Sequence, residues 1–360
     1  MTAKTDFHPL RVAEVRRETS DSVSILFDVP ADLSNTFAFA PGQYLTLRTD
    51  IAGEDIRRNY SVCVSPLDGE LRVAVKMLGG GRFSTFANER LKSGDTLDVL
   101  AAAGHFTWEF SPERSGRYAA FAAGSGITPV LSLIRTALLT EPESRFTLFY
   151  GNRMSSQILF LETLAALKDR FLGRLEVYHF LTLEEEDIAL FNGRLDRAKC
   201  DEILSTLIDP AAIDAAFICG PEGMMDAAEG ALLAAGVDAG RILVERFISA
   251  GSSPVLDEAA HAKAQAAAGR RMGVILDGRK LTVMFDAEQG NILDSVRAMG
   301  APAPYACKGG VCATCRAKVV TGDVEMRLNY GLTREEVAQG YILTCQAVPT
   351  SEDVVVSYDA

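Results

Sequence analysis

Four cysteines near the end of the chain have the spacing of metal ligands. Cys307, Cys312 and Cys315 form a C-x4-C-x2-C pattern, and Cys345 follows after a gap of 29 residues. Plant-type [2Fe–2S] clusters are held by four thiolates with this spacing. These cysteines are therefore predicted to ligate such a cluster, which carries one electron at a time.

The residues around the thiols favour this cluster over two alternatives. Gly309 and Gly310 allow a tight turn that aims backbone N–H groups at cysteine sulfurs. A structural zinc site usually adds a second C-x2-C pair or histidines, and neither lies near this loop in the sequence. A disulfide framework is not expected, because the opening "MTAKTDFHPLRV" lacks the apolar core of a signal peptide and so predicts a reducing cytoplasm.

Composition limits what the rest of the chain can be. A length of 360 residues suggests two or three domains, and 48% hydrophobic residues suffice for folded cores. No apolar run approaches the length of a membrane span. The net charge of −12 argues against nucleic acid as a partner, so an anionic cofactor would have to be held by local arginines and helix ends.

Hydrophobic patterning predicts three domains of different architecture. Residues 1–111 alternate apolar and polar positions in short runs such as "SVSILFDV", which predicts an antiparallel β-barrel. Residues 112–248 place nearly continuous apolar strands such as "RYAAFAAG" between helical stretches, which predicts an α/β domain with a parallel sheet. Residues 272–360 combine strands and a helix around the cysteine loop, as expected for an α+β domain.

Residues 249–271 are predicted to form a linker. They are rich in Ala, Gly and Ser and lack bulky apolar residues at regular spacing. A flexible chain of this length has a root-mean-square reach of about 25–30 Å, enough for the last domain to swing between two positions. The Ala-rich half could instead be partly helical and act as a spacer.

The first domain carries groups suited to a flavin. In "RRNYSVC", Arg58 and Tyr60 fall on one face of a strand, next to Ser61. Arg58 can bind a diphosphate, Tyr60 can lie against a flat ring, and Ser61 can donate to a ring nitrogen. Further on, "GGGRFS" places Gly81 at the start of a helix, where free N–H groups can bind the same diphosphate.

The second domain has a glycine turn suited to a pyridine dinucleotide. In "AAGSGITPV", Gly124, Gly126 and Thr128 lie between a strand and a helix. Such a turn lets a pyrophosphate approach the backbone, although the third glycine of the usual fingerprint is missing.

Two further strand ends complete the expected nucleotide site. "ICGPEGMM" places Cys219, Gly220 and Pro221 where ligands bind in open parallel sheets. "YGNRMSS" places Asn152 and Arg153 beside two serines. An arginine beside hydroxyl groups suits the 2′-phosphate of NADPH, so NADPH is expected rather than NADH.

With barrel, parallel sheet and cysteine loop in this order, the sequence resembles the ferredoxin–NADP reductase superfamily, in its subgroup with a C-terminal plant-type ferredoxin domain. The resemblance covers essentially the whole chain and rests on "RRNYSVC", "YGNR", "ICGPEGMM", "ERF", the cysteine loop and the tail beyond it. It implies bound FAD and a C-terminal β-grasp fold. Within the subgroup, the chain looks most similar to the reductase subunits of phenylacetyl-CoA epoxidases.

The resemblance also implies roles for single residues. The family's Cys-Gly-Pro turn lies where nicotinamide meets flavin, and its Glu-x-Phe element corresponds to "ERF" here. The residues implied to hold FAD are Arg58, Tyr60, Ser61, Gly81, Phe83, Ser84 and Phe247. The residues expected to be catalytic are Ser61, Cys219 and Glu245.

Together these inferences predict a cytoplasmic reductase that passes electrons from NADPH through FAD and the cluster to an oxygenase. A nicotinamide delivers two electrons as hydride and the cluster accepts one, so FAD must lie between them. The expected partner is the oxygenase component that epoxidises phenylacetyl-CoA. The alternatives are a reductase of a Rieske-type or 3-ketosteroid oxygenase, which would share the cofactor motifs, and a redox sensor without turnover.

Overall fold

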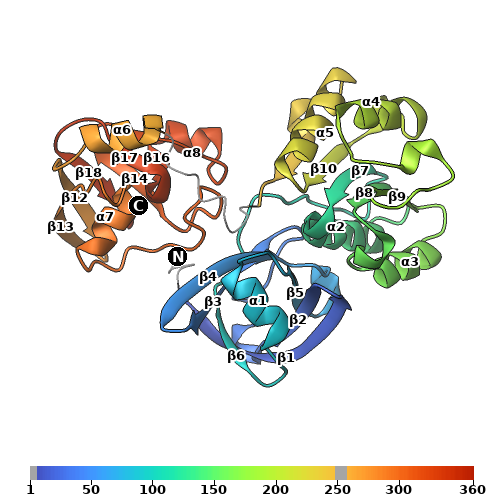
Figure 1. Ribbon diagram of the computed structural model, residues 1–360, viewed down its shortest axis with the longest axis horizontal. Coiled ribbons are helices and arrows are strands. Elements are labelled where there is room, and N and C mark those ends of the chain that lie inside the picture. The colour runs from blue at the N-terminus through green and yellow to red at the C-terminus, as the bar shows by residue number, and fades with distance from the viewer. Residues whose placement is uncertain (1–5, 248–257) are drawn as a thin grey trace. The chain divides into compact units, whose positions relative to one another are not determined.

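The structure is a computed structural model that describes residues 6–247 and 258–360 (Figure 1). It divides into two compact units. One contains nearly all of the first two predicted domains, and the other contains the C-terminal domain. Each unit is described by itself below.

The first domain is a six-stranded antiparallel sheet that closes on itself. Its strands follow the order β4-β3-β6-β1-β2-β5, and a bridge between Val62 and Val73 joins the two edges. Apolar side chains that alternate along the strands fill the interior, and Phe83 and Ala87 of helix α1 pack into it. The elements are β1 His8–Thr19, β2 Ser22–Asp28, β3 Tyr44–Ile51, β4 Glu54–Ser61, β5 Leu71–Lys76, α1 Arg82–Glu89 and β6 Thr96–Val99.

The second domain is a five-stranded parallel sheet of order β11-β10-β7-β8-β9. Helices α2 and α3 cover one face, and α4 and α5 cover the other (Figure 1). The strand order reverses between β7 and β10, so their carboxyl ends form the crevice where such sheets bind ligands. The elements are β7 Arg117–Ala123, α2 Ile127–Thr140, β8 Arg145–Asn152, α3 Leu161–Arg170, β9 Leu175–Leu181, α4 Arg197–Thr206, β10 Ala215–Cys219, α5 Glu222–Ala234 and β11 Ile242–Glu245.

Helix α2 ties the parallel sheet to the barrel. The Ser132 hydroxyl donates to the backbone oxygen of Val64 at 2.6 Å, and the Thr136 and Ser65 hydroxyls lie 2.9 Å apart. Both contacts are buried. Because α2 begins at the glycine turn and also contacts the chain just after β4, it fixes the two expected cofactor regions relative to each other.

The C-terminal unit has a mixed five-stranded sheet of order β13-β12-β18-β14-β16 and a two-stranded ribbon of β15 and β17. Strand β18 runs parallel to β12 and antiparallel to β14. The elements are α6 Glu258–Ala266, β12 Arg271–Leu276, β13 Arg279–Met284, α7 Ile292–Ala298, β14 Arg316–Thr321, β15 Val324–Met326, α8 Arg334–Ala338, β16 Tyr341–Leu343, β17 Ala347–Pro349 and β18 Val354–Ser357.

The second half of the predicted linker contains a helix, in line with the alternative that its Ala-rich half is partly helical. Residues 249–257 of that segment lie outside the described residues, but Glu258–Ala266 form helix α6. Ala264 and Ala267 are buried in the core of the C-terminal unit with Met272 and Val274. Alanine is the strongest helix former, and its short side chain can pack closely against a sheet without the bulky periodicity that usually marks a core helix.

Candidate functional site

Ser61 ends strand β4 with a buried hydroxyl that lacks a partner. The residue is 2% exposed, and its Oγ makes no hydrogen bond within the described part of the chain. A buried polar group without a partner costs about 1–3 kcal/mol, so a bound group that supplies one is expected here. Tyr60 lies beside it, half-buried, with its ring 5.3 Å from that of Phe83. The pair fits the ring edge and ring face of a flavin.

Arg58 lies two residues before Tyr60, and therefore on the same face of β4. Its guanidinium donates to the backbone oxygen of Arg57 at 2.7 Å, which uses one of its five donors. Enough donors remain to bind an oxyanion with two parallel hydrogen bonds.

The start of helix α1 offers backbone rather than side-chain donors. Gly81 is the residue before its first turn, and the Ser84 hydroxyl both accepts from the Leu78 N–H and donates to the Gly81 carbonyl at 3.1 Å. Phe83 is 1% exposed in the barrel core, so its side chain cannot reach a diphosphate. The first-turn N–H groups have no partner within the helix, and they are what this segment can present to a phosphate.

Arg82, the first residue of α1, is directed away from these N–H groups. It forms an ion pair with Glu54, and its guanidinium donates to the backbone oxygen of Ile51 at 2.6 Å. The helix start is thereby fastened to the hairpin that leads into β4.

The glycine turn after β7 lies against the turn after β10. A Cβ added to Gly126 would sit 2.0 Å from the carbonyl oxygen of Cys219, so no other residue fits there. Gly124 has a φ of +54°, which favours glycine, and a Cβ there would meet no atom within 4 Å. The two turns thus leave an open approach beside Gly124 and a closed contact at Gly126.

Thr128 serves the turn itself. Its hydroxyl donates to the backbone oxygen of Ser125 at 3.0 Å, and the residue is 3% exposed. Tyr150 on β8 donates to the Gly124 carbonyl at 2.9 Å. Both contacts hold the shape of the turn, and the prediction that Thr128 contacts a cofactor directly has no free hydroxyl to support it.

Cys219 and Glu245 lie side by side at the carboxyl ends of β10 and β11. Cys219 is fully buried, and burial, reinforced by the Glu245 carboxyl, raises the pKa of its thiol well above the ordinary value. Desolvation raises the pKa of Glu245 to about 8. A protonated thiol is a poor nucleophile, and the Cys219 side chain is packed in the domain core, so it is not suited to covalent catalysis.

After these two strand ends, Pro221 and Phe247 are exposed to solvent, whereas Gly220 is closely packed. Pro221 is exposed at the start of α5, and the backbone of Gly220 approaches Met224 so closely that a Cβ would meet its Cε at 2.3 Å. Phe247, two residues beyond β11, is 38% exposed, which is unusual for so large an apolar ring.

The raised pKa of Glu245 predicts a specific pH dependence of stability. The folded-state pKa of about 8 lies above that of a carboxyl in an unfolded chain, so the stabilisation is complete at low pH and is lost as the pH rises through about 8. Glu245→Gln does not titrate. Between about pH 5 and pH 8, we expect the Tm of the wild-type protein to fall relative to the Tm of the Gln variant. The expected fall is about 2–4 °C for each kcal/mol lost from the free energy of unfolding. Thermal unfolding followed by circular dichroism tests this, and parallel curves would contradict it.

At the end of β8, the serine donors predicted to lie beside Arg153 are already occupied by a carboxylate. Asn152 is buried with its Nδ2 lacking a partner, and Arg153 is exposed. The backbone N–H and the hydroxyl of Ser155, however, bond to the carboxylate of Glu184 at 3.0 and 3.2 Å. Sequence reasoning missed Glu184, although the acidic run "EEED" directly after a predicted strand was a signal for it.

The cysteine loop encloses its sulfurs with backbone donors. The N–H groups of Gly309 and Cys312 both approach the Cys307 sulfur at 3.4 Å, and the Cys307 N–H approaches the Cys312 sulfur at 3.4 Å. Gly310 has a φ of +80°, as a tight turn requires. Donors arranged around sulfur stabilise thiolates and the negative charge of a cluster.

The four cysteines lie in two pairs. Contact with Cys312 raises the pKa of the Cys307 thiol, and the same contact lowers the pKa of the Cys312 thiol. Cys315 and Cys345 are likewise in contact. Within the described ranges, no three potential ligands converge on one point where a single metal ion could sit. Two thiol pairs fit a two-iron cluster, in which each iron takes two cysteines, better than one zinc ion.

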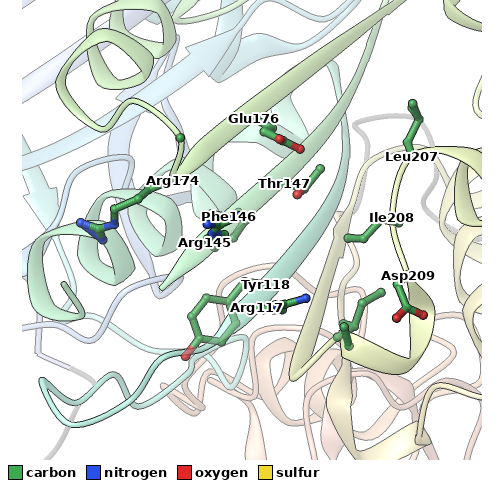
Figure 2. A pocket seen from close by; sticks show the side chains of 13 residues that line it. Arg117, Tyr118, Arg145, Phe146, Thr147, Arg174, Glu176, Leu207, Ile208 and Asp209 are labelled. Atoms are coloured by element: carbon green, nitrogen blue, oxygen red, sulfur yellow. The ribbon is translucent and has the colours of Figure 1, made fainter. Parts of the chain in front are cut away.

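A cavity of about 230 Å³ lies at the opposite end of the parallel sheet, among the amino ends of β7, β8 and β9. Figure 2 shows Arg117, Arg145, Glu176 and Asp209 among its lining side chains. Cofactors bind at carboxyl ends in sheets of this type, and the lining mixes both charges. We therefore assign the cavity no part in the cofactor sites.

Three family models match the chain in the predicted order. They are the oxidoreductase FAD-binding domain over residues 9–108, the oxidoreductase NAD-binding domain over 121–230 and the 2Fe-2S iron-sulfur cluster binding domain over 274–350. The protein is therefore an oxidoreductase that combines FAD-, NAD- and 2Fe-2S-binding domains. No helix within residues 6–247 and 258–360 is long and apolar enough to cross a membrane.

Curated relatives identify the family. The chain is 47% identical over 356 residues to one of the subunits of 1,2-phenylacetyl-CoA epoxidase from Escherichia coli K12, covering 99% of both proteins. It is 34% identical to the ferredoxin reductase component of 3-ketosteroid-9-alpha-monooxygenase from Rhodococcus rhodochrous, covering 97% of this chain and 96% of that one. The chain belongs to this family of oxygenase reductases, as predicted.

Solved structures agree with the predicted fold. A phthalate dioxygenase reductase covers 98% of this chain and 98% of its own, with a TM-score of 0.59 and 20% identity. An intact type IV self-sufficient cytochrome P450 monooxygenase has a TM-score of 0.71 and 22% identity, covering 97% of this chain and 41% of its own. At these identities the likeness concerns the fold alone. It confirms an antiparallel FAD domain, a parallel NAD domain and a C-terminal 2Fe-2S domain.

Proposed function

We propose that this protein is the reductase component of a phenylacetyl-CoA epoxidase and passes electrons from NADPH through FAD and a [2Fe–2S] cluster to the oxygenase component. The observation that carries the proposal is the 47% identity to the Escherichia coli epoxidase polypeptide, extending over 99% of both chains. The cytoplasm is the proposed location, because it supplies NADPH and keeps the chain's free cysteines reduced.

The proposed flavin site combines strand β4 with the start of α1. The orphan hydroxyl of Ser61 and the ring of Tyr60 would contact the flavin ring, and Arg58 would bind the diphosphate together with the N–H groups after Gly81. Phe247 supplies an exposed ring for the same cofactor.

The proposed nicotinamide site is the crevice between the turns at Gly124 and Cys219. Bound flavin would accept hydride there and release its two electrons singly. The thiol of Cys219 lies buried beneath this crevice and Glu245 ends the next strand, and the raised pKa of each group leaves both without charge, which suits a dry setting for hydride transfer. The other proposed contacts to the dinucleotide are Gly126, Asn152, Arg153, Gly220 and Pro221, and Thr128 is proposed to act through the turn that it holds in shape.

The proposed cluster ligands are Cys307 with Cys312, and Cys315 with Cys345. The two thiol pairs and the backbone donors around Cys307 support this assignment.

The preference for NADPH is proposed to depend on Arg153. Its guanidinium makes no ion pair or side-chain hydrogen bond in the part of the chain that the structure describes, so it is available for a 2′-phosphate. A hydrogen bond between charged groups contributes about 1.5–3 kcal/mol. We therefore expect Arg153→Ala to lower kcat/KM for NADPH by about 10- to 100-fold and to leave NADH almost unchanged.

Steady-state kinetics with both nucleotides tests this expectation. Arg170→Ala, which removes an exposed arginine at the end of α3, is the matched control. Because the Glu184 carboxylate occupies the Ser155 donors, Glu184→Gln should raise the preference for NADPH. An unchanged ratio of the two kcat/KM values in Arg153→Ala would assign the 2′-phosphate to another residue.

Reconstitution tests the proposed partner. The reductase and NADPH are mixed with each purified oxygenase, and product is measured per NADPH consumed. We expect tight coupling with the phenylacetyl-CoA oxygenase. The second candidate is a 3-ketosteroid oxygenase, which the 34% identity to its reductase component favours. Tight coupling to that enzyme or to another Rieske-type oxygenase, with none to the phenylacetyl-CoA system, would overturn the proposal.

Turnover with an artificial acceptor separates this enzyme from a redox sensor. A reductase should reduce ferricyanide rapidly with NADPH. A sensor without turnover would show reduction of its own cofactors and no sustained consumption of NADPH.

A further inference from the structure

Gln346 follows the cysteine ligand Cys345 directly and is buried, with 3% of its surface exposed. Its side-chain Nε2 donates to the backbone oxygen of Lys308 at 2.9 Å and approaches the Cys345 sulfur at 3.6 Å. One amide group therefore contacts both the cysteine loop and a sulfur of the proposed cluster.

Arg327 fixes which end of this amide faces the sulfur. Its guanidinium donates to Gln346 Oε1 from Nε at 3.3 Å and from Nη2 at 2.9 Å. A guanidinium has donors only, so the amide oxygen must face Arg327, and the NH₂ group must face the Lys308 carbonyl and the sulfur. The Arg327 backbone N–H also bonds to the Gln346 carbonyl at 2.9 Å, which holds the two residues in register.

The cysteine loop is shaped around this side chain. A Cβ added to Gly310 would lie 3.0 Å from Gln346 Cγ, and the loop turns there with a φ of +80°. The amide is thus enclosed between the loop and Arg327. In such a dry setting a hydrogen bond is stronger than in water, and the positive charge of Arg327 polarises the amide toward donating.

We propose that Gln346, positioned by Arg327, raises the reduction potential of the cluster by donating a hydrogen bond to the Cys345 sulfur. Reduction adds one electron from the flavin and makes the cluster more negative by one charge, with no bond formed or broken. A donor to a ligand sulfur stabilises that charge, and such hydrogen bonds are among the factors that set cluster potentials. The inference rests on the proposed function only in taking Cys345 as a ligand.

The test measures the midpoint potential of the cluster in the full-length holoprotein by redox titration followed by electron paramagnetic resonance. Gln346→Met keeps the length of the side chain but has no N–H donor, so the potential is expected to shift to more negative values. Arg327→Met is expected to shift it in the same direction. If Arg327 acts through the amide, the double variant should shift no further than Gln346→Met alone.

Arg279→Met is the control for loss of one positive charge, because Arg279 is exposed at the start of the edge strand β13. It should leave the potential unchanged. An unchanged potential in Gln346→Met with full iron content would overturn the proposal, and fully additive shifts would overturn the positioning role of Arg327. If Gln346→Met does not retain iron, the midpoint potential of the cluster in Arg327→Met tests the proposal instead. An unchanged potential in Arg327→Met would then contradict it. Wild-type protein without any iron would instead refute the cluster assignment itself.

Discussion

Cys345→Ser is expected to abolish iron binding while leaving the flavin in place. Cys345 pairs with Cys315 in the C-terminal unit, whereas Tyr60, Ser61 and the start of α1 belong to the other unit. A serine hydroxyl is a far weaker iron ligand than a thiolate. We expect NADPH-driven reduction of ferricyanide to persist and electron transfer to the oxygenase to disappear. Iron, sulfide and FAD contents per chain and both activities are the measurements.

Cys200→Ala is the matched control for this experiment. Cys200 is also fully buried, but it lies on α4 in the parallel-sheet domain, so iron should be retained. Normal iron content in Cys345→Ser would contradict the ligand assignment. Zinc in place of iron in the wild-type protein would contradict the cluster altogether.

Gly126→Ala is expected to abolish reduction by NADPH without loss of the cluster. The new Cβ would lie 2.0 Å from the Cys219 carbonyl oxygen, so the start of α2 and the turn after β10 must separate. We expect kcat/KM for NADPH to fall by about 100-fold or more, equivalent to about 3 kcal/mol of transition-state stabilisation. Stopped-flow experiments measure reduction of the flavin by NADPH and, separately, by dithionite, which needs no nucleotide site. Only the reduction by NADPH should fail.

Gly223→Ala makes the same chemical change nearby in helix α5, where a Cβ would meet no atom within 4 Å. NADPH should reduce the flavin of this variant at the wild-type rate. Iron content reports on the integrity of the C-terminal unit in both variants. Reduction of Gly126→Ala by NADPH at the control rate would show that the nicotinamide does not bind in this crevice.

Much of the architecture was predictable because its signals are local. Alternating polarity predicted the barrel, and continuous apolar strands between helices predicted the parallel sheet. For the alanine-rich segment before β12 the sequence left a flexible linker and a helix open, because the small side chains through which this segment packs, Ala264 and Ala267, resemble those of a linker in composition.

The cofactors that single loops can bind could also be predicted from the sequence. Three of the four cysteines and the glycines between them belong to one short stretch, because thiolates that bind the same two irons must lie within a few ångströms of one another. The residue types of "RRNYSVC" and "GGGRFS" similarly indicated a flavin without any knowledge of their neighbours.

Tertiary structure decided the contacts between residues far apart in the chain. Strand order brings the Gly126 turn against Cys219, register places Glu245 beside that cysteine, and the loop after β9 carries Glu184 to Ser155. The spacing of the cysteines predicted Cys345 as a ligand. The contacts of the adjacent Gln346 side chain with Arg327 and Lys308 could not be predicted, because they form only in the folded chain. The sequence by itself determined which cofactors the loops suit, since ligand chemistry depends on residue type. Only the fold decided which groups are buried without partners, which carboxylates face the site and which pKa values move, because these depend on distances that no local pattern encodes.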